Sequence, residues 1–92
     1  MVGWTFLTNH AQVLLCIAAN QRATAKEMAQ TVGVTERAVQ RIIDNLEEEG
    51  YISRFRDGRK NRYEIHRKRP MRHPAQAGQT IGDLLAALNV GE

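Results

Sequence analysis

The chain has 92 residues, of which 42% are hydrophobic and 25% charged, and its formal net charge is +3. This composition fits one globular domain spanning 1–92, excludes a disordered chain, and leaves little room for most classes of enzyme. Because Cys16 is the single cysteine and no paired Cys/His spacing, leader or long apolar run occurs, we expect a cytoplasmic protein without a metal, a cofactor or a membrane span.

The first predicted helix runs from a cap at Thr8 to about Asn20. Its apolar stripe follows helical spacing and consists of Ala11, Leu14, Leu15 and Ala18, widened by Val13 and Ile17. This pattern predicts a mostly buried helix. The apolar segment 4–7 ahead of it packs either on the domain or on a partner subunit, and the sequence leaves both alternatives open.

A second helix is predicted from a capping box. Thr24 and Glu27 have the spacing at which a threonine hydroxyl and a glutamate satisfy each other's backbone N–H groups. The helix runs to Val32, because Gly33 supplies the left-handed residue that ends it.

Thr35 then caps a third helix of about fifteen residues, which Gly50 ends. Its apolar stripe is Val39, Ile42, Ile43 and Leu46. At 100° per residue, Arg37, Gln40 and Arg41 fall on the opposite side. One face of this helix is therefore core, and the other is available for a partner.

The period changes after this helix, where two β-prone runs flank Asp57-Gly58. Because both residues tolerate a positive φ, the sequence predicts a hairpin with a two-residue Asp57-Gly58 turn. The resulting pairs are Arg56 with Arg59, Arg54 with Asn61, and Ile52 with Tyr63. Like charges facing each other at the hairpin tip favour a nearby anion.

Positive charge gathers in and after this hairpin. Residues 51–72 hold nine Lys/Arg and two Asp/Glu, a net of +7, whereas 1–50 and 73–92 each carry a net of −2. Ten of the thirteen basic residues are arginine, whose planar guanidinium suits phosphate groups and guanine edges. Such a segment attracts polyanions.

The last part of the chain contains a basic linker over 67–79, with Pro70 and Pro74, which is predicted to be extended rather than folded. A capped helix over 80–88 follows, and its apolar face is Ile81, Leu84, Leu85 and Leu88. A helix this short must dock on something. Packing on the first helix and a seam between two subunits both remain open.

The order of elements over 24–65 resembles the winged helix-turn-helix of small bacterial and archaeal transcriptional regulators. Ala29, Gly33 and Val39 stand where that motif has a small residue, a glycine and a β-branched residue. The stretch VQRIIDNLEEEGYI over 39–52 is similar to the second motif helix of the MarR-like group. The resemblance covers about 8–66 and implies a mainly α fold with a small β-hairpin: a three-helix core, a wing and a short C-terminal helix.

The resemblance further implies a regulator that binds double-stranded DNA without catalysis, with a recognition helix over about 35–49 in the major groove and a wing over 54–62 on the backbone or minor groove. The expected DNA-contacting residues are Thr35, Arg37, Gln40, Arg41, Arg54, Arg56, Arg59, Lys60 and Arg62. A homodimer is expected because operators commonly have two half-sites. The alternative is a winged-helix protein-interaction module, and the presence of a small-molecule effector stays open.

Overall fold

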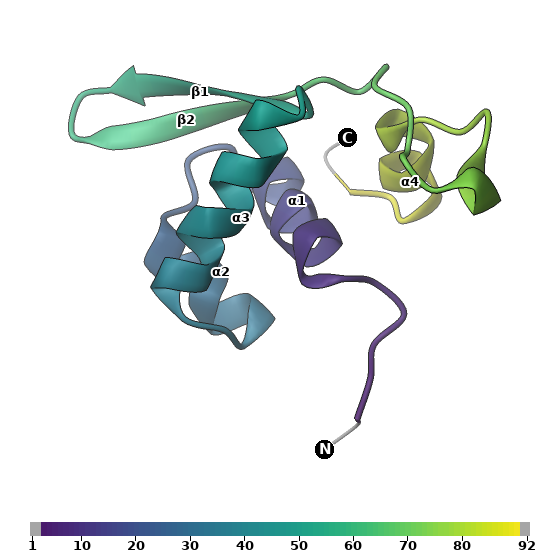
Figure 1. The fold of residues 1–92 in the computed structure, drawn as a ribbon. Coiled ribbons are helices and arrows are strands. Elements are labelled where there is room, and N and C mark those ends of the chain that lie inside the picture. Colours follow the sequence, from purple (N-terminus) through teal and green to yellow (C-terminus); the bar gives the residue numbers. More distant parts are fainter. Residues whose placement is uncertain (1–2, 91–92) are drawn as a thin grey trace.

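The structure, a computed structural model, describes residues 3–90. Helices α1 (Asn9–Ala19), α2 (Ala25–Val32) and α3 (Glu36–Glu48) come first. An antiparallel hairpin of β1 (Ile52–Asp57) and β2 (Lys60–Ile65) follows, and the chain ends with the 3-10 turn η1 (Pro74–Gln76) and helix α4 (Ile81–Ala87) (Figure 1). This is the predicted fold class, mainly α with one small hairpin.

Threonine side chains cap each α-helix of the described residues, as predicted. Each accepts a hydrogen bond from the backbone N–H three residues on, and the four are Thr8, Thr24, Thr35 and Thr80. Two of them form complete capping boxes, in which Glu27 and Asp83 accept in return from the backbone N–H of the cap residue. Gly33 ends α2 with φ 86°, a conformation that glycine adopts without steric cost.

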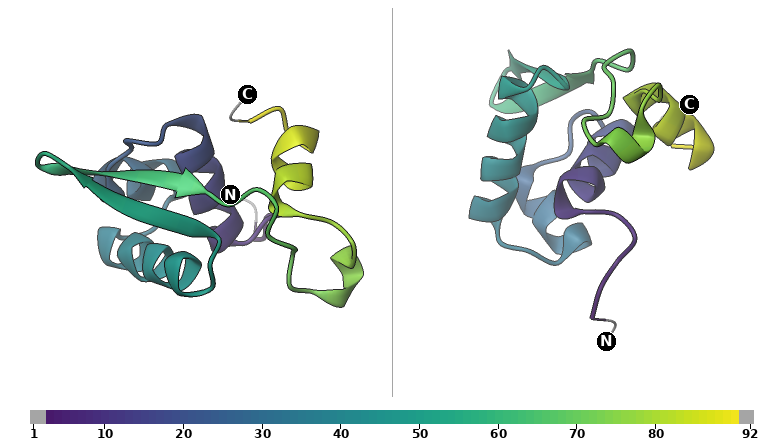
Figure 2. Two further views of the ribbon diagram at one scale, coloured as in Figure 1. Left: turned by 90° about the horizontal axis from the view of Figure 1, so that it is seen from above. Right: turned by 45° about the vertical axis from the view of Figure 1, so that its right-hand side comes forward.

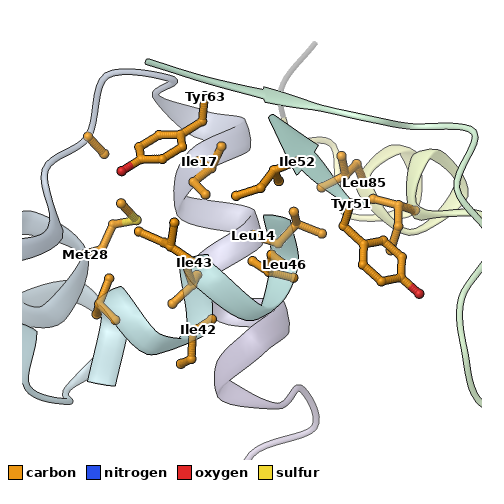
Figure 3. Close-up of a cluster of buried hydrophobic side chains, with 14 of the residues drawn as sticks. Leu14, Ile17, Met28, Ile42, Ile43, Leu46, Tyr51, Ile52, Tyr63 and Leu85 are labelled. Carbon is orange, nitrogen blue, oxygen red and sulfur yellow. The ribbon is translucent and has the colours of Figure 1, made fainter. Parts of the chain in front are cut away.

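One hydrophobic core lies between α1, α2, α3 and the base of the hairpin (Figure 3). The whole predicted stripe of α3 is buried: Val39, Ile42, Ile43 and Leu46. On α1 the buried face is rotated from the centre of the predicted stripe, because the helix contacts α2, α3 and β2. Its fully buried residues are Val13, Leu14 and Ile17, while Ala11, Leu15 and Ala18 are only partly buried.

The hairpin forms, but its predicted register is wrong. Gly58 and Arg59 make the turn, so that Asp57 pairs with Lys60. Gly58 has φ 66°, and the turn contains no other positive φ. A type I′ turn needs two such residues, whereas a type II′ turn needs one glycine at its first central position, as here. The observed register also sets opposite charges, rather than two arginines, across from each other at the tip.

The register error does not change which side chains face the core. Ile52 lies opposite Ile65, and Arg54 opposite Tyr63, a displacement of two residues from the predicted pairs. Because side chains alternate along a strand with a period of two, a shift of two residues keeps each one on its face. Ile52 and Tyr63 are accordingly both buried.

The connection after the hairpin is folded, which corrects the expectation of an extended linker. Pro70 and Thr80 form an isolated β-bridge, and η1 lies between them with Pro74 at its first position, where no N–H is needed. The hydroxyl of Tyr51 donates to the Pro70 carbonyl at 3.0 Å. Proline therefore shapes a compact loop here.

Helix α4 docks on the core of its own chain through one side. Ile81 and Leu85 are buried, Leu84 is half-buried, and Leu88 keeps 44% of its surface exposed. Intramolecular packing thus accounts for part of the predicted apolar face, and its last leucine remains outside.

Seen from above, the hairpin runs between α3 on one side and α1 and α2 on the other (Figure 2). Its tip points away from α4. Within residues 3–90, no helix combines the length and the apolarity needed to cross a bilayer.

Candidate nucleic-acid interface

The outer face of α3 presents three long polar side chains, Arg37, Gln40 and Arg41, all of them exposed. The buried stripe on the opposite face fixes the orientation of the helix. Within residues 3–90, neither Arg37 nor Arg41 has a hydrogen-bond or ion-pair partner. Both lie in the half of α3 that follows its N-terminus, where the helix dipole favours anions. These guanidinium groups are available to an external acceptor.

Thr35 stands at the start of the same face. Its hydroxyl oxygen accepts from the backbone N–H of Ala38 at 3.0 Å, so it acts as the N-cap of α3. The residue is exposed. Its position at a helix N-terminus is one where backbone N–H groups and the dipole favour a phosphate.

Arg54 connects β1 to α3. It donates from Nη2 to Asp44 Oδ1 at 2.7 Å and to Glu47 Oε1 at 3.0 Å. The hydrogen bond to Asp44, reinforced by Glu47, raises the pKa of Arg54 above its ordinary value. Two carboxylates of α3, those of Asp44 and Glu47, thus hold the hairpin against the helix.

Two further arginines of the hairpin have partners within it. Arg56 donates from Nε to the Gly58 carbonyl at 3.1 Å, across the turn. Arg62 donates to Glu64 at 2.7 Å, and its guanidinium lies 4.7 Å from the ring centre of Phe55, a cation–π contact. These contacts order the strands of the hairpin.

Arg59 and Lys60 are exposed at the hairpin tip. Neither forms an ion pair with another of the described residues, although Lys60 is close enough to Glu27 to lower the pKa of that carboxyl. The nine predicted residues therefore fall into two groups. The side chains of five, namely Arg37, Gln40, Arg41, Arg59 and Lys60, form no hydrogen bond or ion pair with another of the described residues, and those of the other four already form one.

A cleft of about 340 Å³ separates α3 from the hairpin. Its lining includes Arg22, Gln40, Arg54, Arg59 and Lys60, together with one acidic residue, Asp44. The hairpin is held over the α1–α2 turn by a hydrogen bond from the Tyr63 N–H to the Gln21 carbonyl at 3.0 Å. The cleft thus brings together cations from the α1–α2 turn and from the hairpin.

Arg22 is the residue of this cleft that sequence reasoning missed. It lies in the turn between α1 and α2 and forms an ion pair with Asp57 at the end of β1, 35 residues further on. No local pattern marks such a contact. The basic character of Arg22, just before the Thr24 capping box, was the one feature of the sequence that could have suggested a role in binding.

The basic residues after the hairpin contact the other end of α3. Arg69 donates from Nε to the Glu49 carbonyl at 3.2 Å, and Arg72 lies 3.8 Å from the Glu49 carboxylate. Cations at a helix C-terminus complement the dipole. Arg69 and Arg72 thus lie where they stabilise the end of α3.

Cys16 lies partly buried in α1, and burial raises the pKa of its thiol, which lowers its reactivity. In the part of the chain that the structure describes, no three His, Cys, Asp or Glu side chains gather in a way that could hold a metal ion.

Comparison with known proteins gives a family match and matches among solved structures. The family model described as winged helix-turn-helix DNA-binding matches residues 8–53, half of the chain. Among solved structures, the chain is similar to MepR, described as a transcription regulator of the Staphylococcus aureus multidrug efflux pump MepA, with a TM-score of 0.60 and 19% identity. That match covers 89% of this chain and 55% of MepR, so the chain spans about half of MepR's length. A search of curated proteins finds no match.

Proposed function

Because the chain belongs to the winged helix-turn-helix DNA-binding family, as the order of its elements predicts, we propose that it is a sequence-specific regulator of transcription that binds double-stranded DNA. It acts by occupying an operator, without catalysis. The likeness to MepR, itself a transcription regulator, supports the regulatory part of the proposal through the shared fold.

The observation that carries the proposal is the exposed face of α3. Arg37, Gln40 and Arg41 are unengaged side chains on the second helix of the family's motif. In the major groove, arginine donates two hydrogen bonds to guanine O6 and N7, and glutamine pairs with adenine N6 and N7. We assign base reading to these three residues and a phosphate contact to Thr35.

The wing supplies affinity rather than sequence preference. Arg59 and Lys60, at the tip, neutralise backbone phosphates, with Arg56 beside them. Arg54 and Arg62, which are engaged with carboxylates, act first as supports that keep the hairpin in position.

A protein-interaction module is the alternative function for this fold. A protein partner is favoured by apolar or acidic residues on the outer face of the second motif helix. On α3, Arg37, Gln40 and Arg41 are exposed there, whereas the acids Asp44 and Glu47 are bound to Arg54. DNA is therefore the better partner for the observed chemistry.

We further propose that the regulator is a cytoplasmic homodimer. Two copies bind two half-sites about one helical turn apart, which multiplies both affinity and discrimination. Exposed apolar side chains support this proposal: Trp4, Phe6 and Leu88 keep 68%, 92% and 44% of their surface exposed.

Selection of bound fragments from random duplex DNA tests the function directly. The expected result is a palindromic consensus of two half-sites, since a symmetric dimer reads the same sequence on both strands. Recovery of no enriched sequence, together with no duplex binding in dilute buffer, would contradict the proposal. Recovery of a single, non-repeated site would keep the DNA-binding function and contradict the dimer.

A further inference from the structure

The cleft between α3 and the hairpin holds more positive charge than its own acids balance. Asp44 is the one acidic residue of its lining and is already bound to Arg54. Three cations then remain, Arg22, Arg59 and Lys60. None of them belongs to α3, since they come from the α1–α2 turn and the hairpin tip. A strand of nucleic-acid backbone beside α3 would meet all three.

Arg22 differs from the other two because it has an acidic partner. Its Nη1 pairs with Asp57 Oδ2, and the two side chains keep 58% and 44% of their surface exposed. Arg22 lines the cleft, whereas Asp57 ends β1 and is not part of the lining. An ion pair this exposed is weak, because water screens it and two side chains lose freedom. A stronger acceptor that enters the cleft can therefore displace the carboxylate.

We propose that Arg22 is a ligand for a backbone phosphate of the bound duplex, and that Asp57 holds the guanidinium at the cleft until the phosphate replaces the carboxylate. This inference rests on the proposed DNA-binding function and adds a contact from outside both the recognition helix and the wing. A phosphodiester has two non-bridging oxygens that match the paired N–H donors of a guanidinium. Arg59 and Lys60 flank the same cleft and neutralise neighbouring phosphates.

A phosphate-binding role for Arg22 and a purely structural role for the ion pair predict opposite changes in DNA affinity when the Asp57 carboxylate is removed. If the pair only fixed the hairpin tip, removal of either partner would loosen the tip and weaken DNA binding. If Arg22 serves the phosphate, Asp57 competes with the DNA. Removal of the carboxylate then strengthens binding, and removal of the guanidinium weakens it.

The test compares Arg22→Gln and Asp57→Asn by fluorescence anisotropy with a short labelled duplex, over about 50 to 200 mM salt. Arg22→Gln is expected to weaken binding about tenfold at the lowest salt and to reduce the slope of log K against log salt by about 0.9, the value for one lost phosphate contact. Asp57→Asn is expected to tighten binding about two- to fivefold with an unchanged slope, because the number of phosphate contacts stays the same.

A second ion pair of the chain provides matched controls. Arg72 and Glu49 lie 3.8 Å apart at the C-terminal end of α3 and outside the cleft. Arg72→Gln and Glu49→Gln make the same charge changes as the two test variants. They are expected to leave the salt slope unchanged and to alter affinity less than the corresponding cleft variants. Thermal unfolding followed by circular dichroism checks that all four variants remain folded.

The double variant Arg22→Gln/Asp57→Asn isolates the coupling between the two residues. The gain from Asp57→Asn is expected to disappear when Arg22 is absent, since the carboxylate then has no phosphate ligand to withhold. A gain that persists in the double variant is a general charge effect and overturns the inference. Weaker binding by both single variants overturns it as well, while the proposed function stands. No duplex binding by the unmodified chain overturns the proposed function and this inference together.

Discussion

At the scale of single residues, the partners of each arginine distinguish those that support the fold from those available to bind DNA. Arg54 donates to two carboxylates of α3, and its exchange onto DNA would leave Asp44 and Glu47 facing the phosphates without a counter-ion. Arg41 has no such partner within residues 3–90. The proposed function therefore assigns different tasks to these two arginines.

This distinction predicts different losses for Arg41→Ala and Arg59→Ala. Removal of a base-reading guanidinium is expected to cost about 1 to 3 kcal/mol of binding free energy at one or two base pairs and to relax the preference there. Removal of a phosphate-contacting one weakens binding to all duplexes and makes the salt dependence shallower. Competition binding with a selected site and its point variants measures both effects. Equal losses on every sequence for Arg41→Ala would contradict its base-reading role.

A pH dependence is expected from Glu27. Its pKa lies below the ordinary value of 4.5 because the carboxylate accepts from the Thr24 backbone N–H, with a further contribution from Lys60. The ionised form is therefore favoured by folding. Its stabilisation is complete above the pKa of the unfolded chain and is lost as the pH falls through the lower pKa of the folded state.

Urea unfolding of the unmodified chain and of Glu27→Gln, followed by circular dichroism, measures this contribution. The free energy of unfolding is expected to be higher for the unmodified chain at neutral pH, and the difference is expected to shrink at acid pH, as the pH falls through the lowered pKa of the folded state. A difference of the same size at both pH values would assign the effect to something other than ionisation.

At the scale of elements, the helices were predictable because their signals are local. A threonine and an acid three residues apart, or a glycine at a helix end, determine a boundary within one or two turns of chain. The hairpin was predictable in place but not in register, since Asp57-Gly58 and Gly58-Arg59 are both acceptable two-residue turns. The choice between them depends on cross-strand charges, and on the pairing of Asp57 with Arg22, which a local reading does not contain.

The turn between α2 and α3 depends on the left-handed conformation of Gly33, and substitutions there measure what this conformation contributes to stability. Gly33 has φ 86°, and a Cβ added to it would contact nothing within 4 Å. Gly33→Ala is therefore expected to lower the free energy of unfolding by about 1 kcal/mol through backbone strain alone. Gly33→Asn is expected to lose less, because asparagine tolerates this conformation. Chemical denaturation compares the two, and equal losses would argue against strain as the cause.

At the scale of the whole molecule, the candidate site arises from contacts between distant segments. Cations converge at the cleft where the Tyr63 N–H donates to the Gln21 carbonyl and Arg54 ties β1 to α3. The exposed face of α3 followed from helical periodicity, which acts within one element. The place of Arg22 did not follow, since it requires knowing where the hairpin lies on the helices. The sequence therefore predicted the exposed face of α3 but not the place of Arg22 in the cleft.

The apolar surface at the two ends of the chain bears on the proposed dimer. Trp4 and Phe6 stack edge to face, with their ring centres 4.9 Å apart, and remain exposed, as does Leu88 on α4. Burial of large apolar side chains between two subunits is the common way to stabilise a homodimer. Leu84 is the weaker position for a test because it is half-buried beside Leu14 in an apolar groove, so that a charge there also disturbs the fold.

We therefore expect Leu88→Asp and Trp4→Ala to shift the chain from dimer to monomer in sedimentation velocity, with unfolding midpoints close to that of the unmodified chain. Gln79→Asp is the matched control, because it adds the same charge at an exposed position of the same segment and is expected to remain dimeric. The monomeric variants are expected to lose most of their affinity for a two-half-site duplex and little for a single half-site, since each domain keeps its own contacts. An unchanged sedimentation coefficient for both variants would place any subunit contact elsewhere on the molecule, away from the ends of the chain.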